Sequence, residues 1–331
     1  MRTIRFAAVV AAALWALAAL QPAIAKETGG PWLYAVNTAT FSQDWRHDEP
    51  LLIKLQVLLD RAHFSPGVID GQAGMNTQRA LRAYQQAHGL NPTGKLDEDT
   101  WNRLGGNDSQ DVVEDYEISK ADEAGPFARH IPKSFKAMSK LKALSYTSPA
   151  ELLAEKFHMD IGLLRQLNRG TSFDNAGTTI VVTNVRDVNH PGFKDARIEV
   201  RKRDQSVVAL DKSGNVLAYF PATIGSTEMP SPSGTAKVKG IAKDPHYRYD
   251  PKKLHFPGVK LKHPVTIAPG PHNPVGRVWI ALSKEGYGIH GSPDPSAVRR
   301  QASHGCVRLT NWDAIELANA TKPGTPVVFV K

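Results

Sequence analysis

The stretch GIHGSPDPSAVRRQASHGCVRLTNW, residues 288–312, contains Cys306, the only cysteine among the 331 residues of the chain. A single cysteine cannot form a disulfide within the chain. Cysteine is one of the most frequently buried residue types, so a structural place in a core is the ordinary expectation. Here, however, its neighbours are polar or conformationally permissive: Ser303, His304, Gly305 and Arg308. This setting favours a reactive thiol over a core side chain.

A cysteine nucleophile needs a base to remove its proton and hydrogen-bond donors for the oxyanion that forms during acyl transfer. Gly305 allows the backbone to turn sharply, which would aim the N–H groups of His304, Gly305 and Cys306 at one point. His290 and His304 are both candidate bases, and spacing alone does not choose between them. Arg308 follows by two residues, so on an extended strand it shares a face with the cysteine, where it could bind a substrate carboxylate and favour the thiolate. Such activation would make the thiol alkylate faster than free cysteine.

A zinc site is the alternative interpretation of the same side chains. It would use Cys306, His290 and His304, with Asp294 as a fourth ligand. Zinc sites that contain cysteine usually contain more than one, and the chain has no second cysteine. We therefore expect chemistry without a metal or an organic cofactor, because a thiolate, an imidazole and backbone donors cover every step of acyl transfer.

Residues 196–331, which surround this stretch, have the pattern of a mostly β domain. Short runs rich in β-branched residues alternate with turns such as DKSG, residues 211–214. The expected strands are 197–202, 206–210, 216–222, 237–242, 278–282, 288–290, 306–309 and 326–330. Only residues 312–320 have a helical pattern, with Asn311 as the expected cap. The pattern predicts a sandwich or a barrel-like sheet.

The motif IHG…SHGCVRL resembles that of the L,D-transpeptidases, whose catalytic domain is described as YkuD-like. Further stretches resemble the same family in the same order: PSPSGTAKV (230–238), DPHYRYDP (244–251), PGPHNPVG (269–276) and GTPVVFV (324–330). The resemblance therefore extends over nearly the whole of the predicted β domain.

This resemblance assigns roles to individual residues. It implies that Cys306 is the nucleophile and His290 the base, with the backbone carbonyl of Gly291 orienting the imidazole. Oxyanion or orienting roles are implied for Gly291, His304 and Gly305, and substrate contacts for Ser303, Arg308 and Asn273. Residues 298–300, Val-Arg-Arg, depart from the Ile-Gly that is common in the family, which leaves the conformation of this loop and the acceptor it admits open.

The resemblance also implies a reaction on peptidoglycan in two steps. The thiolate attacks a tetrapeptide stem after its third, diamino acid residue, releases D-Ala and forms a thioester, which an amine of another stem resolves into a 3→3 cross-link. Water as acceptor would make the enzyme an L,D-carboxypeptidase, and a protein lysine would attach an envelope protein to the wall. The non-enzymatic alternative is a wall-binding scaffold protein with a decayed catalytic domain, which is disfavoured by the joint presence of Cys306, His290, Gly305 and Arg308.

Residues 47–106 have the pattern of a small all-α domain with three helices. Apolar residues at helical spacing predict the first two, the second starting near Thr77 and ending at Gly89, and residues 97–104 predict the third. The sequence GVIDGQAGMNTQRALRAYQQAHGLNPTGKLDEDTWNRL, residues 67–104, resembles the peptidoglycan-binding domain of bacterial wall hydrolases. Such a domain would hold the protein on the wall.

The segment between these two domains is less distinctive. Residues 107–139 are polar and are expected to be a linker. Residues 140–188 have the order strand, helix, helix, strand, and resemble a small α+β LysM-like domain. Whether this module binds glycan or spaces its neighbours is left open.

The N-terminus has the features of a secretory signal over residues 1–25, with Arg2 and Arg5, an apolar run over 6–20 and the sequence AIA at 23–25. That run is shorter than the ~20 residues of a membrane span, so no stable span is expected after cleavage. The interpretation places the protein in the periplasm or cell envelope. A formal charge of +9 suits contact with anionic envelope polymers. No basic stripe interleaved with aromatics suggests a nucleic-acid partner.

Overall fold

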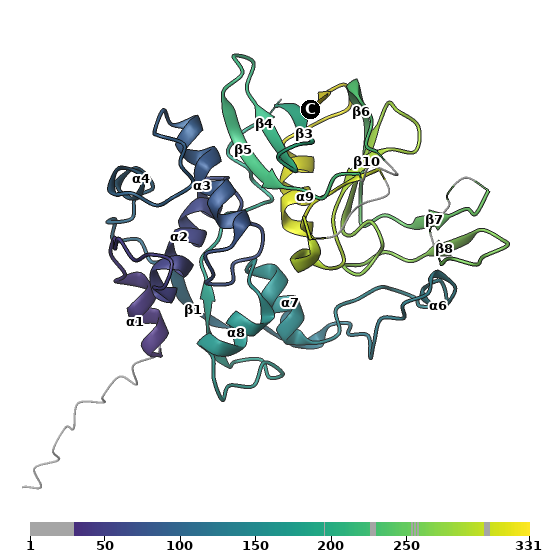
Figure 1. Ribbon diagram of the computed structural model, residues 1–331. Helices are drawn as coiled ribbons and strands as arrows, with labels where there is room; N and C mark the ends of the chain where they lie inside the picture. The colour runs from purple at the N-terminus through teal and green to yellow at the C-terminus, as the bar shows by residue number, and fades with distance from the viewer. Residues whose placement is uncertain are drawn as a thin grey trace, which may run out of the picture.

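The computed structural model describes residues 30–194, 196–225, 230–252, 254, 256, 258–300 and 305–331. The expected signal segment, residues 1–25, and the site candidates Ser303 and His304 lie outside the described residues. No helix within the described ranges combines the length and the apolar character that a membrane span requires. Figure 1 shows the N-terminal helices on one side, the β-rich C-terminal domain on the other and helices α7 and α8 below the two.

The N-terminal domain consists of helices α1 (Pro31–Asn37), α2 (Glu49–Arg61), α3 (Met75–Ala87) and α4 (Glu98–Arg103). Helix α2 begins where the Asp48 side chain accepts a hydrogen bond from Leu51 N, and α4 where Asp97 accepts from Thr100 N. These caps satisfy N–H groups that have no partner in the first turn. The three-helix domain expected at 47–106 corresponds to α2, α3 and α4. Helix α1, which precedes it, was not predicted.

The middle module pairs two strands with two helices. Strand β1 (Val113–Glu117) runs antiparallel to β2 (Thr179–Thr183), and between them in the chain come α7 (Pro149–Lys156) and α8 (Ile161–Leu167). The order strand, helix, helix, strand is therefore present. Its first strand, however, lies in the segment expected to be a linker, 107–139, and not at the start of residues 140–188.

The misplacement of this strand has a physical reason. The sequence of β1, VEDYE, contains three acidic residues, and only Val113 is fully buried, so apolar alternation gave no signal. Residues 118–148 are inserted before α7 and carry α5 (Lys120–Ala124) and α6 (Phe135–Met138). Leu144, near the expected strand, is tied instead to the C-terminal domain, because its N–H donates to Pro269 O at 2.8 Å and its carbonyl accepts from His272 N at 3.1 Å.

The C-terminal domain contains all the strands that the sequence predicted, and one additional hairpin formed by β7 and β8. Its elements are β3 (Arg197–Arg201), β4 (Ser206–Leu210), β5 (Val216–Pro221), β6 (Gly234–Lys243), β7 (Tyr247–Tyr249), β8 (Val265–Ile267), β9 (Val278–Leu282), β10 (Gly288–His290), the 3₁₀ turn η1 (Pro295–Ala297), β11 (Val307–Arg308), α9 (Asn311–Asn319) and β12 (Pro326–Val330). The hairpin was not predicted: its strands are three residues long and, unlike the equally short β10, they are not part of the motif around the cysteine.

Eight of these strands form one sheet in the order β11-β10-β9-β6-β12-β3-β4-β5. The pairs β10–β11 and β12–β3 are parallel. Thr223, just beyond β5, and Arg308 of β11 exchange backbone hydrogen bonds of 2.8 and 2.9 Å. Because β5 and β11 are the two edges, this bridge closes the sheet toward a barrel, one of the two predicted shapes. Helix α9 packs Ala314 and Leu317 into the core of the domain.

A buried ion cluster joins all three modules. Arg186, whose side chain is 3% exposed, bonds Asp60 of α2 through Nη1, and lies 2.6 Å from Asp313 Oδ1 and 2.5 Å from Glu316 Oε2, both on α9. Burial lowers the pKa of Arg186, but the three carboxylates raise it by more, so the guanidinium stays charged. We call these four residues the Arg186 cluster. Buried charges are tolerated only with such partners, so the cluster fixes the relative positions of the three modules.

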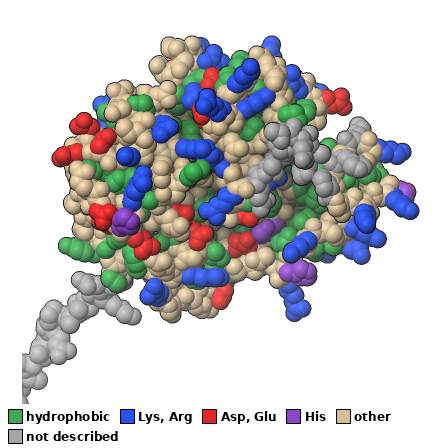
Figure 2. Space-filling model, viewed as in Figure 1, with side chains coloured by type: hydrophobic (Ala, Val, Ile, Leu, Met, Phe, Trp, Pro, Cys, Tyr) green, Lys and Arg blue, Asp and Glu red, His purple; other side chains and the backbone are tan. Residues whose placement is uncertain are grey.

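Basic side chains gather at the end of the molecule that carries α6, β7 and β8, as Figure 2 shows. Exposed members of this basic rim are Lys133, Lys136, Lys140, Lys142, Arg248, Lys260 and Lys262. A surface of one sign attracts polymers of the opposite sign. The rim therefore favours the approach of anionic substrates to this end.

Candidate active site

Strands β10 and β11 bring the sequence candidates together. They are parallel neighbours, with Ile289 opposite Val307 and His290 opposite Arg308. Side chains alternate along a strand, so Ile289 and Val307 point into the core, where both are buried. Cys306, His290 and Arg308 consequently share the other face.

That face forms part of a cavity of about 720 Å³, which we call the cysteine cavity. His290, Cys306 and Arg308 line it together. Its other walls are largely apolar and aromatic, and include Phe135, Met138, Tyr247, Phe256 and Trp279. An apolar lining lowers the local polarity and so strengthens electrostatic interactions between groups at its surface.

His290 is 4% exposed and held in one orientation. Its Nδ1 lies 2.7 Å from Gly291 O, the contact that the resemblance implied, and its ring stacks on Trp279 with centroids 5.5 Å apart. If Nδ1–H donates to this carbonyl, Nε2 carries the lone pair. Burial lowers the pKa of His290 to about 3, helped by the charge of Arg308 and opposed by the hydrogen bond to Gly291. The imidazole is therefore neutral at pH 7 and able to accept a proton.

The carbonyl of Gly291 is positioned by a close approach of three segments. A Cβ atom at Gly291 would lie 2.1 Å from Asn311 Oδ1, so only glycine fits there. Asn311 is fixed in turn, because its Oδ1 accepts from Arg277 N at 3.0 Å and its Nδ2 lies 3.1 and 3.2 Å from the carboxylate oxygens of Glu155. Glu155 belongs to α7, so the middle module braces the residue that orients the histidine.

Cys306 is partly buried beside the histidine strand. Its Sγ lies 3.7 Å from Gly286 O, to which the thiol donates. Burial raises the pKa of Cys306, and the opposing effects of a backbone hydrogen bond from Gly288 and of the Arg308 charge are smaller. Arg308 favours the thiolate, as expected, but burial has the larger and opposite effect on the pKa of Cys306. The proton has to be removed by a base during attack.

Arg308 directs its guanidinium into the cavity from β11. Its Nε is buried without a hydrogen-bond partner among the described residues. Burial lowers the pKa of Arg308, while the nearby Cys306 and Asp294 raise it by less. A guanidinium with an unused buried donor is suited to an anionic group of a ligand.

The structure also describes two further residues for which the sequence predicted a role, Gly305 and Asn273. Gly305 has φ +103°, the left-handed region that favours glycine, and its carbonyl accepts from Ser231 Oγ at 2.7 Å. Asn273 was predicted to contact substrate but is fully buried, with its amide donating to Pro245 O and Ala268 O and accepting from Val275 N. The side chain of Asn273 therefore stabilises its own loop and joins it to the β6–β7 connection.

A wall of the cysteine cavity comes from residues that sequence reasoning missed. Ile131, Lys133, Phe135 and Met138 line it, all from the segment expected to be a linker. Phe135 packs on Tyr249 and Tyr247, at centroid distances of 5.1 and 5.8 Å, and thereby fixes α6 on the β7–β8 hairpin. The only signal was an aromatic residue in an otherwise polar stretch.

Comparisons with known proteins agree with this geometry. Residues 195–329 match the L,D-transpeptidase catalytic domain family (YkuD), and residues 48–104 match a putative peptidoglycan-binding domain. Neither match covers the middle module. The chain thus carries an L,D-transpeptidase catalytic domain and a peptidoglycan-binding domain.

Two curated relatives each match just over half of the chain. A putative L,D-transpeptidase of Bacillus licheniformis, YkuD, is 27% identical over 179 residues, which are 54% of this chain and 90% of the relative. A probable L,D-transpeptidase of Escherichia coli, YbiS, is 26% identical over 192 residues, 56% of this chain and 60% of the relative. The chain therefore spans nine-tenths of the first relative and less than two thirds of the second.

Similarity to solved structures is weaker. An L,D-transpeptidase from Xylanimonas cellulosilytica covers 84% of this chain and 92% of its own, at 17% identity and a TM-score of 0.36. One from Mycobacterium smegmatis covers 47% of this chain and 64% of its own, at 19% identity and a TM-score of 0.33.

Proposed function

We propose that this enzyme, an L,D-transpeptidase of peptidoglycan that carries a peptidoglycan-binding domain, forms 3→3 cross-links with Cys306 as nucleophile and His290 as general base. One observation carries the assignment: an oriented imidazole and the sole thiol share one face of adjacent strands and line one cavity with largely apolar walls. A neutral histidine beside a protonated thiol is the resting state that general-base catalysis requires.

In the first step, Cys306 Sγ attacks the carbonyl carbon of the third residue of a tetrapeptide stem. His290 Nε2 takes the thiol proton as the C–S bond forms. Backbone N–H groups around Gly305 and Cys306 are the proposed donors to the oxyanion. When the C–N bond to D-Ala breaks, the imidazolium returns the proton to the departing amine, which leaves a thioester and a neutral histidine.

In the second step, the amine of another stem attacks the thioester carbonyl. His290 removes a proton from the attacking nitrogen as the C–N bond forms, and the C–S bond then breaks to regenerate the thiol. The apolar walls disfavour water as acceptor, which supports transpeptidation over the carboxypeptidase alternative. Attachment of a protein lysine uses the same chemistry and is distinguished only by the acceptor.

Arg308 is proposed to bind a carboxylate of the donor stem. Its unpartnered Nε and its place in the cavity support this role. A bidentate contact would both hold the stem and orient the scissile bond.

For the middle module we propose a bracing function in place of the glycan binding that its LysM-like pattern suggested. The support is the contact of Glu155 with Asn311, the first residue of α9, and the contact of Glu151 with His272, at 2.9 Å, in the wall of the cysteine cavity. Saturable binding of glycan oligomers to this module would favour the earlier interpretation. The enzyme acts at the cell envelope, and we propose export to the periplasm through residues 1–25.

The test is mass spectrometry of residues 26–331 incubated with purified tetrapeptide muropeptides, beside Cys306→Ala. We expect two joined stems less one alanine, absent in the variant. Tripeptide products alone would identify a carboxypeptidase. The absence of both products and of any thioester would favour the wall-binding scaffold. Sedimentation with intact wall sacculi is the control, since the variant retains the peptidoglycan-binding domain.

A further inference from the structure

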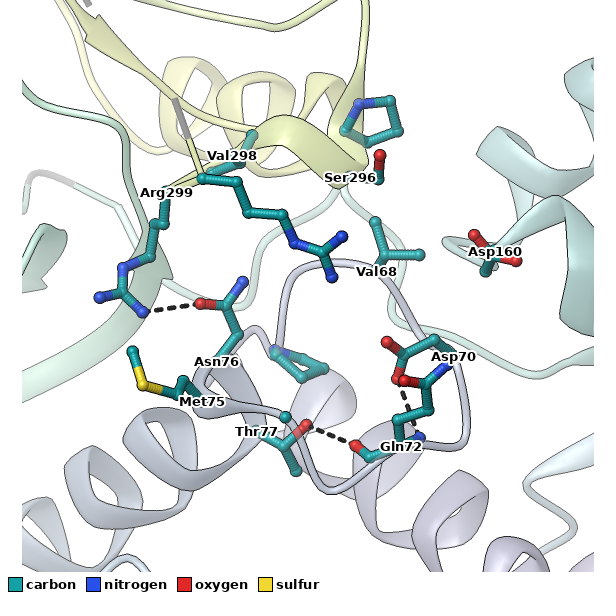
Figure 3. A pocket seen from close by; sticks show the side chains of 14 residues that line it. Val68, Asp70, Gln72, Met75, Asn76, Thr77, Asp160, Ser296, Val298 and Arg299 are labelled. Atoms are coloured by element: carbon teal, nitrogen blue, oxygen red, sulfur yellow. Dashed lines mark hydrogen bonds between the residues drawn. The ribbon is translucent and has the colours of Figure 1, made fainter. Parts of the chain in front are cut away.

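A second cavity, of about 560 Å³, lies where the three modules meet, and we call it the junction cavity. Its walls come from the α2–α3 loop and the first turn of α3, from Asp160 at the start of α8, and from residues 295–300 of the C-terminal domain. Figure 3 shows this arrangement, with Arg299 and Asn76 on one side and Asp70 and Asp160 on the other. Both signs of charge therefore line one cavity, which is open to solvent on the side of the exposed Arg300.

The cationic side of the junction cavity is built from three features. Arg299 donates through Nη1 to Asn76 Oδ1 at 2.7 Å, while its Nε is buried without a partner among the described residues. Arg300 lines the cavity next to it. The N-cap residue of the 13-residue helix α3 is Gly74, which has no side chain to cap the helix. The first turn of α3 therefore presents N–H groups without a side-chain cap and the positive end of the helix dipole. Together these groups are suited to a carboxylate.

The anionic side consists of Asp70 and Asp160. Asp70 accepts from Gln56 Nε2 at 2.7 Å and from Gln72 N at 3.0 Å, both through Oδ1. Burial raises the pKa of Asp70, two hydrogen bonds lower it, and the negative charge of Asp160 raises it again. An ammonium group placed between the two carboxylates would relieve that repulsion.

The junction cavity adjoins the cysteine cavity through one loop. Asp294 and Ala297 line the cysteine cavity, whereas Ser296 and Val298 line the junction cavity. Arg299 holds the loop in place, with φ +71° and its N–H donating to Thr223 Oγ1 at 2.6 Å. Thr223 is the residue that pairs with Arg308. An occupant of the junction cavity would thus touch the loop that borders the site of chemistry.

We propose that the junction cavity binds a second, non-reacting stem peptide, with its terminal carboxylate at Arg299, Arg300 and the start of α3, and a free ammonium at Asp70 and Asp160. The substrate class rests on the function proposed above. The volume is within the range of specific ligand sites, and the pairing of opposite charges selects a ligand that carries both. Arg299 and Arg300, which stand where the family pattern differs, would thereby recognise the peptide carboxylate.

The test is calorimetric titration of the Cys306→Ala protein, residues 26–331, with a synthetic stem tetrapeptide that has a free side-chain amine and a free C-terminus. We expect two binding sites. In the Arg300→Gln background the second affinity should fall at least about tenfold, the usual loss for a charge-assisted hydrogen bond. Asp160→Asn should weaken it similarly, and Asn still caps α8. Arg203→Gln, an exposed arginine on the β3–β4 turn, is the matched control.

Peptide variants identify the groups that are bound. Amidation of the C-terminus should mimic Arg300→Gln, and acetylation of the amine should mimic Asp160→Asn. A single site in the Cys306→Ala protein, or a second site indifferent to both substitutions, would overturn the proposal. Because the variant cannot turn over, this result is independent of whether the wild-type protein forms cross-links in the muropeptide assay.

Discussion

The cysteine cavity and the junction cavity lie on either side of residues 292–300 and are built in opposite ways. The first has largely apolar walls beside the Cys306 thiol, the His290 imidazole and the Arg308 guanidinium, and burial moves the pKa of His290 to about 3 and raises that of Cys306. The second is lined by two arginines, two aspartates and several neutral polar groups. In the cysteine cavity, burial changes the pKa values of groups that exchange protons. In the junction cavity, side chains of both charges line a surface that is suited to binding a charged ligand.

The largest effect expected on this contrast is that of His290→Ala. Loss of the proposed general base should reduce kcat by about 10²–10⁴-fold, while peptide binding at the junction cavity stays unchanged. Steady-state release of D-Ala, with calorimetry as the control, measures both. If the variant's kcat were within a few-fold of the wild-type value, His290 would not be the general base.

The pH dependence of kcat/KM sharpens the same assignment. A base whose pKa is lowered to about 3 remains deprotonated from pH 7 down to pH 5, so no acid limb from His290 should appear in that range.

The raised pKa of Cys306 should also make iodoacetamide react more slowly than with free cysteine at pH 7, opposite to the sequence-based expectation. Fast alkylation at neutral pH would instead indicate a thiolate–imidazolium pair.

Arg186→Met tests how much the Arg186 cluster contributes to the stability of the three-module assembly on which both cavities depend. Removing the cation leaves Asp60, Asp313 and Glu316 buried together, and breaking a buried ion pair in this way costs about 3–5 kcal/mol. Thermal unfolding of the variant and of Arg203→Gln gives the comparison. A variant as stable as the control would show that the cluster contributes little to the assembly.

Arg308→Ala should lower kcat/KM by about 10–100-fold, the usual value of a charge-assisted hydrogen bond. Because its positive charge lowers the pKa of Cys306, the same variant should shift the pH midpoint of alkylation upward. Arg308→Lys should restore the midpoint more fully than kcat/KM, since a lysine keeps the charge but not the bidentate fork. Equal recovery of both would argue against carboxylate binding.

The smallest effect is expected for Phe135→Ala in α6. Loss of its contacts with Tyr247 and Tyr249 should loosen that wall and raise KM several-fold with little change in kcat. Steady-state kinetics with muropeptides measures the split. A change confined to kcat would mean that α6 acts on the chemistry and not on substrate binding.

Sequence reasoning succeeded where local pattern and chemistry coincide. The strands around Cys306 and helices α2, α3 and α4 were expected because periodicity encodes them locally, and the contact between His290 and Gly291 was implied by the motif. It failed where the decisive contact joins distant residues. The acidic strand β1 is defined by its pairing with β2, and Phe135 gains its role from a hairpin more than 100 positions away.

The direction of the thiol pKa also escaped sequence reasoning. The charge of Arg308 is visible in the sequence, but the burial that outweighs it is produced by α6, β7 and the surrounding walls together. Asn273 is a similar case, since its amide nitrogen donates to Ala268 O in its own loop and to Pro245 O in the β6–β7 connection.

The Arg186 cluster has a consequence for how the enzyme works along its polymer. A flexible tether would let the catalytic domain sample many stems around one anchoring point, with a reach set by linker length. Here the wall-binding domain is locked to α9 through buried charges, so anchor and nucleophile keep one separation and one orientation. The distance between wall attachment and the proposed nucleophile is then set by the fold and not by the length of a linker.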